Sequence, residues 1–287
     1  MWDTEPRRIL VVVDRGGSGA AVRYGASESL RTGRPLRLVH AAPPGDSWLR
    51  TVGLDALRRS TTMALSEVVG KVPVDSALVA GGLHAIAAEA TTAAVVVIEQ
   101  LPAGSHRTPT ASVAGALGAV TDTPVVVIPA EWVERHRGVV TVGLDPTTVD
   151  DVAIRAAILL ARLRKAVLRV VAGSASDADR ADIEARLERW GGDGCDVAVE
   201  LTSRSPAEAL EEASASSDLL VVGRHRPRLP EDSRLSEVML ELLVRLRCPV
   251  LLTAPGHVSA FAGRTPAARA CPSPAPMPTS SRSRGQT

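Results

Sequence analysis

The stretch Arg8-Ile9-Leu10-Val11-Val12-Val13-Asp14 decides the fold, because the chain contains it twice. Its second copy is Val139-Val140-Thr141-Val142-Gly143-Leu144-Asp145, at an offset of 131 residues (145 − 14). Each copy is an apolar run that ends in an aspartate and leads into an Ala-rich segment. Two later runs also recur in the same order, with 95–98 matching 219–222 and 125–128 matching 250–252. A period this long indicates a duplicated domain and not a short solenoid repeat.

The apolar runs are short, continuous and rich in β-branched residues, which is typical of strands buried on both faces of a parallel sheet. Segments with helical spacing lie between them, and Ser205-Pro206-Ala207-Glu208 has the form of a capping box that begins a helix. The alternation predicts an α/β fold of two tandem doubly wound domains, at 7–130 and 138–255. Residues 256–287 are rich in Pro, Ser and Arg and are expected to be a disordered tail.

The composition excludes several classes of function. The net charge of +1 gives no global electrostatic attraction for nucleic acid or an anionic membrane, and one Tyr and one Phe cannot form stacking platforms for single strands. The three cysteines lack the paired spacing of a zinc site or a disulfide framework. Without a signal peptide or a long apolar run, the chain is expected to be cytoplasmic, with no membrane and no specific nucleic acid among its partners.

Three features together resemble a universal stress protein domain, most closely in the second half: the strand-ending aspartates of both halves, Ser217-Asp218-Leu219-Leu220-Val221-Val222-Gly223, and Arg247-Cys248-Pro249-Val250. The resemblance covers about residues 7–255. It implies a five-stranded parallel sheet of order 3-2-1-4-5 in each domain, flanked by helices. It also implies that the fifth strands meet, which makes the chain an intramolecular pseudo-dimer that could dimerise further. One branch of the family binds ATP where the strand order reverses.

That branch carries a motif after strand four: Gly, two residues, Gly, nine residues, Gly, then Ser or Thr. Glycines let backbone N–H groups close on phosphates, and the last pair begins a helix whose N-terminus favours negative charge. Counting back from the proline before strand five places the motif at Gly223, Arg226, Ser236 and Glu237 in the second half and at Ile98, Leu101, Ala111 and Ser112 in the first. Only Gly223 and Ser112 fit, so we predict no cofactor and at most weak ATP binding.

If a nucleotide or anion site persists, it is expected in the second half, at Asp145, Gly223, Arg224 and Arg226. Asp14 and Asp145 match the family aspartate near the adenine end of the nucleotide. Alternatively, each caps the loop or helix that follows it. The arginines could hold an anion without glycines, or the loop 224–228 could be a solvated charged segment.

Nothing in the sequence forms a catalytic or metal-binding set. The six histidines have no ligand spacing, Cys248 is expected to be an inert core thiol, and Trp132 is expected to pack between the halves. We therefore predict a non-enzymatic stress-response binding or signalling module with an unknown protein partner. The alternative is an ATP- or AMP-binding protein that uses the second domain, and the least supported alternative is a nucleotidyl transferase or hydrolase.

Overall fold

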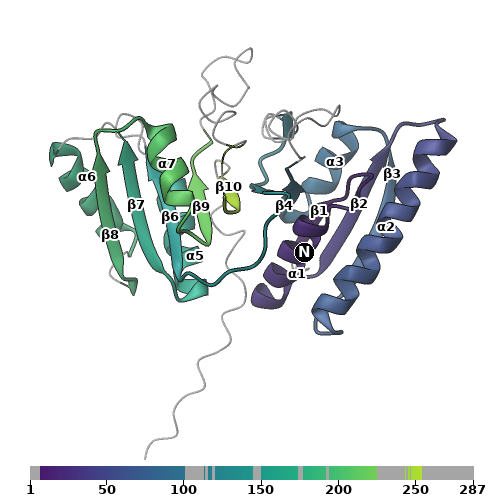
Figure 1. Ribbon diagram of the computed structural model, residues 1–287, viewed down its shortest axis with the longest axis horizontal. Coiled ribbons are helices and arrows are strands. Elements are labelled where there is room, and N and C mark those ends of the chain that lie inside the picture. The colour runs from purple at the N-terminus through teal and green to yellow at the C-terminus, as the bar shows by residue number, and fades with distance from the viewer. Residues whose placement is uncertain are drawn as a thin grey trace, which may run out of the picture.

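The computed structural model describes residues 7–100, 113, 116, 117, 120–144, 150–173, 177–191, 194–224, 243, 245 and 247–253. Figure 1 shows two α/β halves joined across a central pair of strands. The expected tail at 256–287, Asp145 and Arg226 lie outside the described residues. Among the helices that are described, none has the length and apolar character required to cross a bilayer.

The strands follow the apolar runs of the sequence. Those of the first half are β1 (Arg8–Val12), β2 (Leu36–Ala42), β3 (Val74–Ala80), β4 (Ala93–Glu99) and β5 (Val125–Ile128). Those of the second half are β6 (Val139–Leu144), β7 (Val167–Gly173), β8 (Val197–Thr202), β9 (Leu219–Val222) and β10 (Val250–Leu252). The central strands β5, β9 and β10 are buried at every residue, as continuous apolar runs predict, whereas the edge strands β3 and β8 are partly exposed.

The described helices are α1 (Gly19–Thr32), α2 (Ser47–Val68), α3 (Leu83–Ala90), α5 (Asp151–Arg164), α6 (Asp177–Arg189) and α7 (Pro206–Ser214). Side chains of α1, α2, α5 and α6 share one apolar layer, and those of α3 and α7 share the other. The capping box is confirmed, because Ser205 accepts from the N–H of Glu208 and the Glu208 side chain accepts from the N–H of Ser205.

The sheet has the order β3-β2-β1-β4-β5-β10-β9-β6-β7-β8. Each half therefore has the predicted order 3-2-1-4-5, with every pair inside a half parallel. The fifth strands β5 and β10 pair antiparallel, and Val126 lies opposite Leu251. The two predicted five-stranded sheets are thus joined by hydrogen bonds into one sheet of ten strands.

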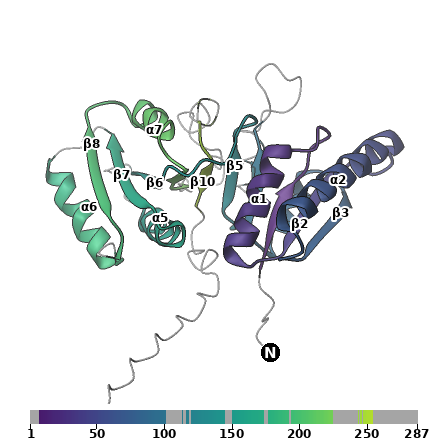
Figure 2. The same cartoon turned by 60° about the horizontal axis from the view of Figure 1, so that its bottom comes forward.

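On the face of the sheet that carries α1 and α5, side chains also close the junction between the halves. Figure 2 shows α1 and α5 on either side of the central strands. Glu28 of α1 forms an ion pair with Arg164 of α5, and both side chains are less than 10% exposed. The ring of Tyr24 meets the ring of Trp132 edge to face, with centroids 5.4 Å apart, which confirms the packing role expected for Trp132.

Candidate functional site

In a doubly wound sheet, ligands bind in the crevice at the carboxyl ends of the first and fourth strands, which are β1 and β4 in the first half and β6 and β9 in the second. In the first half, the loop after β1 is held by Asp14. Its Oδ1 accepts from the backbone N–H groups of Gly16 at 2.6 Å and Gly17 at 3.0 Å, and its own N–H donates to Ser18 Oγ at 2.9 Å. Asp14 therefore has the loop-capping role that was its alternative interpretation.

The neighbouring ends of β1 and β2 are covered by α2. Ser60 Oγ donates to the carbonyl oxygen of Gly17 at 2.6 Å. The buried ring of His40 has Nδ1 2.8 Å from the carbonyl oxygen of Val13, so this nitrogen carries the proton and donates it. The same ring packs so closely on Gly53 of α2 that a Cβ there would overlap it. His40 is a satisfied core histidine, and it fills the space between the two strand ends.

Glu99, the last residue of β4, places its carboxylate at the beginning of α1. Its Oε2 accepts from the backbone N–H of Ala21 at 3.0 Å, and the N–H of Ala20 also donates to this carboxylate. Helix N-termini bind anions because their first N–H groups have no partner within the helix. In the first half, this anion position is occupied by the protein's own side chain.

Burial raises the pKa of Glu99, and the hydrogen bonds from Ala21 and Ala20 lower it by less than burial raises it. The nearby carboxylate of Asp14 raises the pKa further, while Arg23 lowers it. A raised pKa means that this crevice holds a negative charge less favourably than water does. Among the described residues, the donors and cations around Glu99 therefore do not offset the effect of burial on this carboxylate.

In the second half, a carboxylate also lies at the N-terminus of the helix that follows the first strand, but it comes from a different position in the sequence. Asp150 caps α5, where its Oδ1 accepts from the N–H groups of Val152 at 2.8 Å and Ala153 at 3.4 Å. A Cβ built on Gly223 would overlap Oδ2 of Asp150 and lie 3.0 Å from its Cβ. Only glycine fits at 223, because the carboxylate of Asp150 packs directly against its backbone. This packing accounts for the presence of glycine at position 223, and no bound phosphate is needed to explain it.

The strand register corrects the position assigned to the first motif glycine in the first half. Val11 lies opposite Val97, and its repeat Val142 lies opposite Val221, so the counterpart of Gly223 is Glu99. The count from the proline placed it at Ile98, which is wrong by one residue. The reason is that the segment between strands four and five is one residue shorter in the first half.

Arg224 is not on an exposed loop. Its side chain is buried, Nε donates to the carbonyl oxygen of Thr253 at 3.0 Å, and Nη2 donates to that of Thr121 in the first half at 3.2 Å. This guanidinium therefore stabilises the contact between the halves. Of the residues predicted to form the residual site, the structure brings Gly223 and Arg224 to the end of β9. It does not describe Asp145, Arg226 or the remaining motif positions, namely Leu101, Ala111, Ser112, Ser236 and Glu237.

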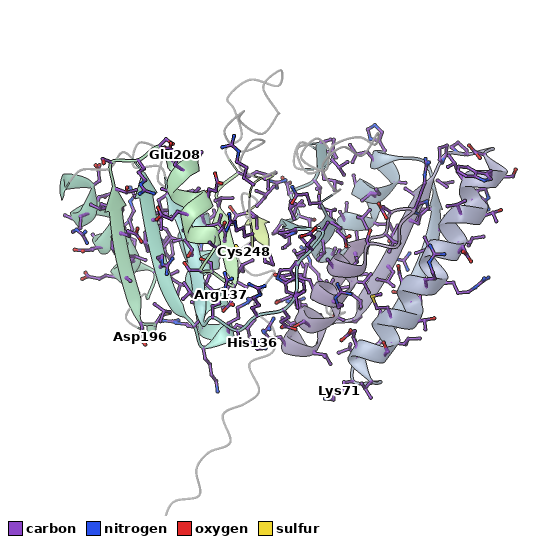
Figure 3. The ribbon with its side chains drawn as sticks, in the orientation of Figure 1. Lys71, His136, Arg137, Asp196, Glu208 and Cys248 are labelled. Carbon is purple, nitrogen blue, oxygen red and sulfur yellow. The ribbon has the colours of Figure 1, made fainter. Side chains whose placement is uncertain are left out.

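A cavity that the sequence did not predict lies at the segment joining the halves. It has a volume of about 350 Å³, and its walls include Trp132, Arg135, Arg137, Arg247 and Cys248. Figure 3 shows Cys248, Arg137 and His136 in the region between the two halves. Burial raises the pKa of Cys248 to about 12, so its thiol stays protonated at neutral pH, as expected for an inert core cysteine. Within the described part of the chain, no three His, Cys, Asp or Glu side chains gather to hold a metal ion.

No family model matches the sequence, and no curated protein matches it. The fold, in contrast, is shared with solved structures. A universal stress protein from Archaeoglobus fulgidus superposes with a TM-score of 0.69 at 13% identity, covering 88% of this chain and 99% of that one. A candidate universal stress protein from Pseudomonas aeruginosa superposes with a TM-score of 0.57 at 18% identity, covering 89% and 96%.

The cytoplasmic domain of a prokaryotic cation chloride cotransporter is also similar, with a TM-score of 0.51 at 12% identity over 86% of this chain and 95% of that one. The same architecture therefore serves proteins of different kinds, and it does not by itself define a function. What the strand order, the antiparallel contact of the fifth strands and these superpositions establish together is the architecture: the chain has the fold of the universal stress proteins, in its tandem two-domain form.

Proposed function

We propose that this protein is a non-enzymatic stress-response module of the universal stress protein type, which acts in the cytoplasm by binding a partner protein. The observation that carries the proposal is the occupation of both crevices by the protein's own carboxylates. Glu99 accepts from the first turn of α1, and Asp150 caps α5 against Gly223. An adenine nucleotide would have to displace a carboxylate before its phosphates reached the N-terminus of α1 in the first half or of α5 in the second.

The electrostatics of the first crevice support the same conclusion. The raised pKa of Glu99 reports an environment that disfavours one negative charge, and a triphosphate would bring several. Arg224, which follows Gly223 at the end of β9, is engaged with two carbonyl oxygens at the contact between the halves. We therefore propose that neither half uses ATP as a cofactor.

Isothermal titration calorimetry of the full chain with Mg-ATP tests this proposal. We expect a dissociation constant weaker than about 100 μM, which corresponds to about −5.5 kcal/mol. Glu99→Gly restores the first motif glycine and removes the carboxylate, so this variant is expected to bind Mg-ATP more tightly than the wild type. Glu212→Gly, which removes an exposed acid elsewhere, is the matched control and should leave the isotherm unchanged.

A stoichiometric isotherm in the low micromolar range with the wild-type protein would contradict the proposal. If Mg-ATP slowed hydrogen exchange mainly at the backbone amides of Gly223 and Arg224, the result would favour the alternative of an ATP- or AMP-binding second domain. Release of inorganic phosphate from Mg-ATP, above the rate of a boiled sample, would contradict the non-enzymatic assignment.

A further inference from the structure

The cavity at the joining segment is a consequence of the sheet topology. Because β5 and β10 are antiparallel, with Val127 opposite Val250, the chain leaves β5 beside the residues that precede β10. β9 runs parallel to β10 on its other side, so Ser217 and Asp218 begin at the same end. Residues 129–137, the start of β9 and the pair Arg247-Cys248 therefore meet at one place, and the cavity of about 350 Å³ lies between them.

The walls of this cavity are fixed by interactions along the joining segment. Asp218 accepts from the N–H of Arg137 at 2.7 Å and from the N–H of Gly138 at 2.6 Å. Glu134 Oε1 accepts from Ser27 Oγ at 2.7 Å, and Trp132 packs edge to face on Tyr24. The segment is thus tied to both halves, and the cavity is part of the folded structure.

The lining carries an excess of available positive charge. Arg135, Arg137 and Arg247 line the cavity, together with the acids Glu131 and Asp218. The Asp218 carboxylate already accepts from three backbone N–H groups, those of Arg137, Gly138 and Val139. Among the described residues, no ion pair joins Arg135, Arg137 or Arg247 to a carboxylate. Arg137 Nη1 donates to the carbonyl oxygen of Ser217 at 3.4 Å, which orients its guanidinium along the wall.

The first half provides an internal comparison, because its fifth strand is preceded by Asp122-Thr123-Pro124 where the second has Arg247-Cys248-Pro249. An acid therefore replaces the arginine in the copy that does not border the joining segment. Both copies fold into the same strand order, so the fold does not require a basic residue at this position. The charge at Arg247 is specific to the side of the molecule that has the cavity.

We infer that this cavity binds a small organic phosphate, held by Arg135, Arg137 and Arg247 and packed against Trp132. Guanidinium groups match the geometry of phosphate oxygens and form strong charge-assisted hydrogen bonds with them. The volume lies near the lower limit of small-molecule sites, which range from about 300 to 1,000 Å³. The half-buried indole of Trp132 offers an aromatic wall for the organic part. This site is separate from the crevices at the ends of β4 and β9.

An NMR titration of the ¹⁵N-labelled full chain tests the inference, with phenyl phosphate, inorganic phosphate and phenol as probes. We expect phenyl phosphate to shift the Trp132 indole N–H and the amides of Arg137 and Ser217, and to do so less at high salt because exposed charges are screened. Phenol should leave these signals in place, and inorganic phosphate should shift them with lower affinity.

Arg135→Gln with Arg247→Gln should weaken phenyl phosphate binding about ten-fold or more, since each guanidinium contributes charge-assisted hydrogen bonds. Both residues are exposed, so the double variant is expected to fold. Arg155→Gln with Arg204→Gln removes the same charge elsewhere, from a guanidinium over the Trp190 ring and from an exposed ion pair, and should bind as the wild type does.

Three outcomes would overturn the inference. One is the absence of shifts at Trp132 in about 10 mM phenyl phosphate, a concentration well above a millimolar dissociation constant. Another is equal affinity in the wild type and in the Arg135/Arg247 variant. The third is a set of shifts confined to the first turn of α1 or to Gly223, which would place the phosphate in a crevice.

Discussion

Removing Glu28 should show how strongly the two halves depend on their buried contact. The carboxylate of Glu28 is 7% exposed and pairs with Arg164, which is 9% exposed and lies in the other half of the chain. Burial lowers the pKa of Arg164, but the charge of Glu28 and the other groups around this guanidinium together raise it by more, so the net shift is upward. Glu28→Ala would leave this guanidinium charged and buried without its main partner.

Breaking a buried ion pair by removing one partner costs about 3–5 kcal/mol, because the remaining charge is uncompensated. For a chain of this size, about 2–4 °C of melting temperature is lost per kcal/mol, so the expected loss is about 6–20 °C. Replacing both partners, as in Glu28→Leu with Arg164→Met, should recover much of this loss because apolar side chains can replace a buried pair at little cost.

Urea unfolding followed by circular dichroism measures these free energies of unfolding. The matched control is Glu212→Ala, which breaks the ion pair between Glu212 and Arg204. The side chain of Glu212 is 66% exposed and that of Arg204 is 58% exposed. Such surface pairs contribute about 0–1 kcal/mol. If Glu28→Ala destabilised the protein no more than Glu212→Ala does, the contact between α1 and α5 would not be the buried charge pair described above.

Two further predictions concern the crevices. Because the folded pKa of Glu99 is raised above its ordinary value of 4.5, its contribution to stability is full below that pH and is lost as the pH rises through the folded pKa. The wild type should therefore lose stability relative to Glu99→Gln as the pH is raised from 4 to 8 in a series of urea titrations, and a constant difference would refute this sign. Gly223→Ala should cost about 1–3 kcal/mol by overpacking against Asp150. Asp150→Ala should reduce that cost in a double-mutant cycle, and additive effects would show that the two residues do not touch.

Much of the fold could be predicted from the sequence, because its signals are local or repeated. Continuous apolar runs predicted the buried strands, and Ser205 and Glu208 predicted the start of α7. The strand order and the contact of the fifth strands followed from the family resemblance. Hydrogen bonding across that contact makes one continuous sheet. It depends on how the two domains approach each other, and no local sequence pattern predicts this approach.

The candidate site was less predictable, because its key contacts join residues far apart in sequence. Counting residues back from the proline assigned the first motif position to Ile98 instead of Glu99, because the loop that was counted differs in length between the halves. Arg224 looked like part of a charged loop, but its partners Thr121 and Thr253 come from both halves of the fold. The cavity at Trp132 arises only where three separate segments meet, although the run of basic residues at 135–137 was visible in the sequence.

We propose that the protein's own carboxylates, Glu99 and Asp150, keep nucleotides out of both crevices of this fold. Native mass spectrometry of the full chain, purified rapidly without added nucleotide, tests it most directly. We predict that the wild type has the mass of the polypeptide alone as purified. We expect the same mass after incubation with Mg-ATP followed by gel filtration. A wild-type protein that carries one adenine nucleotide per chain, retained through purification, would contradict this proposal.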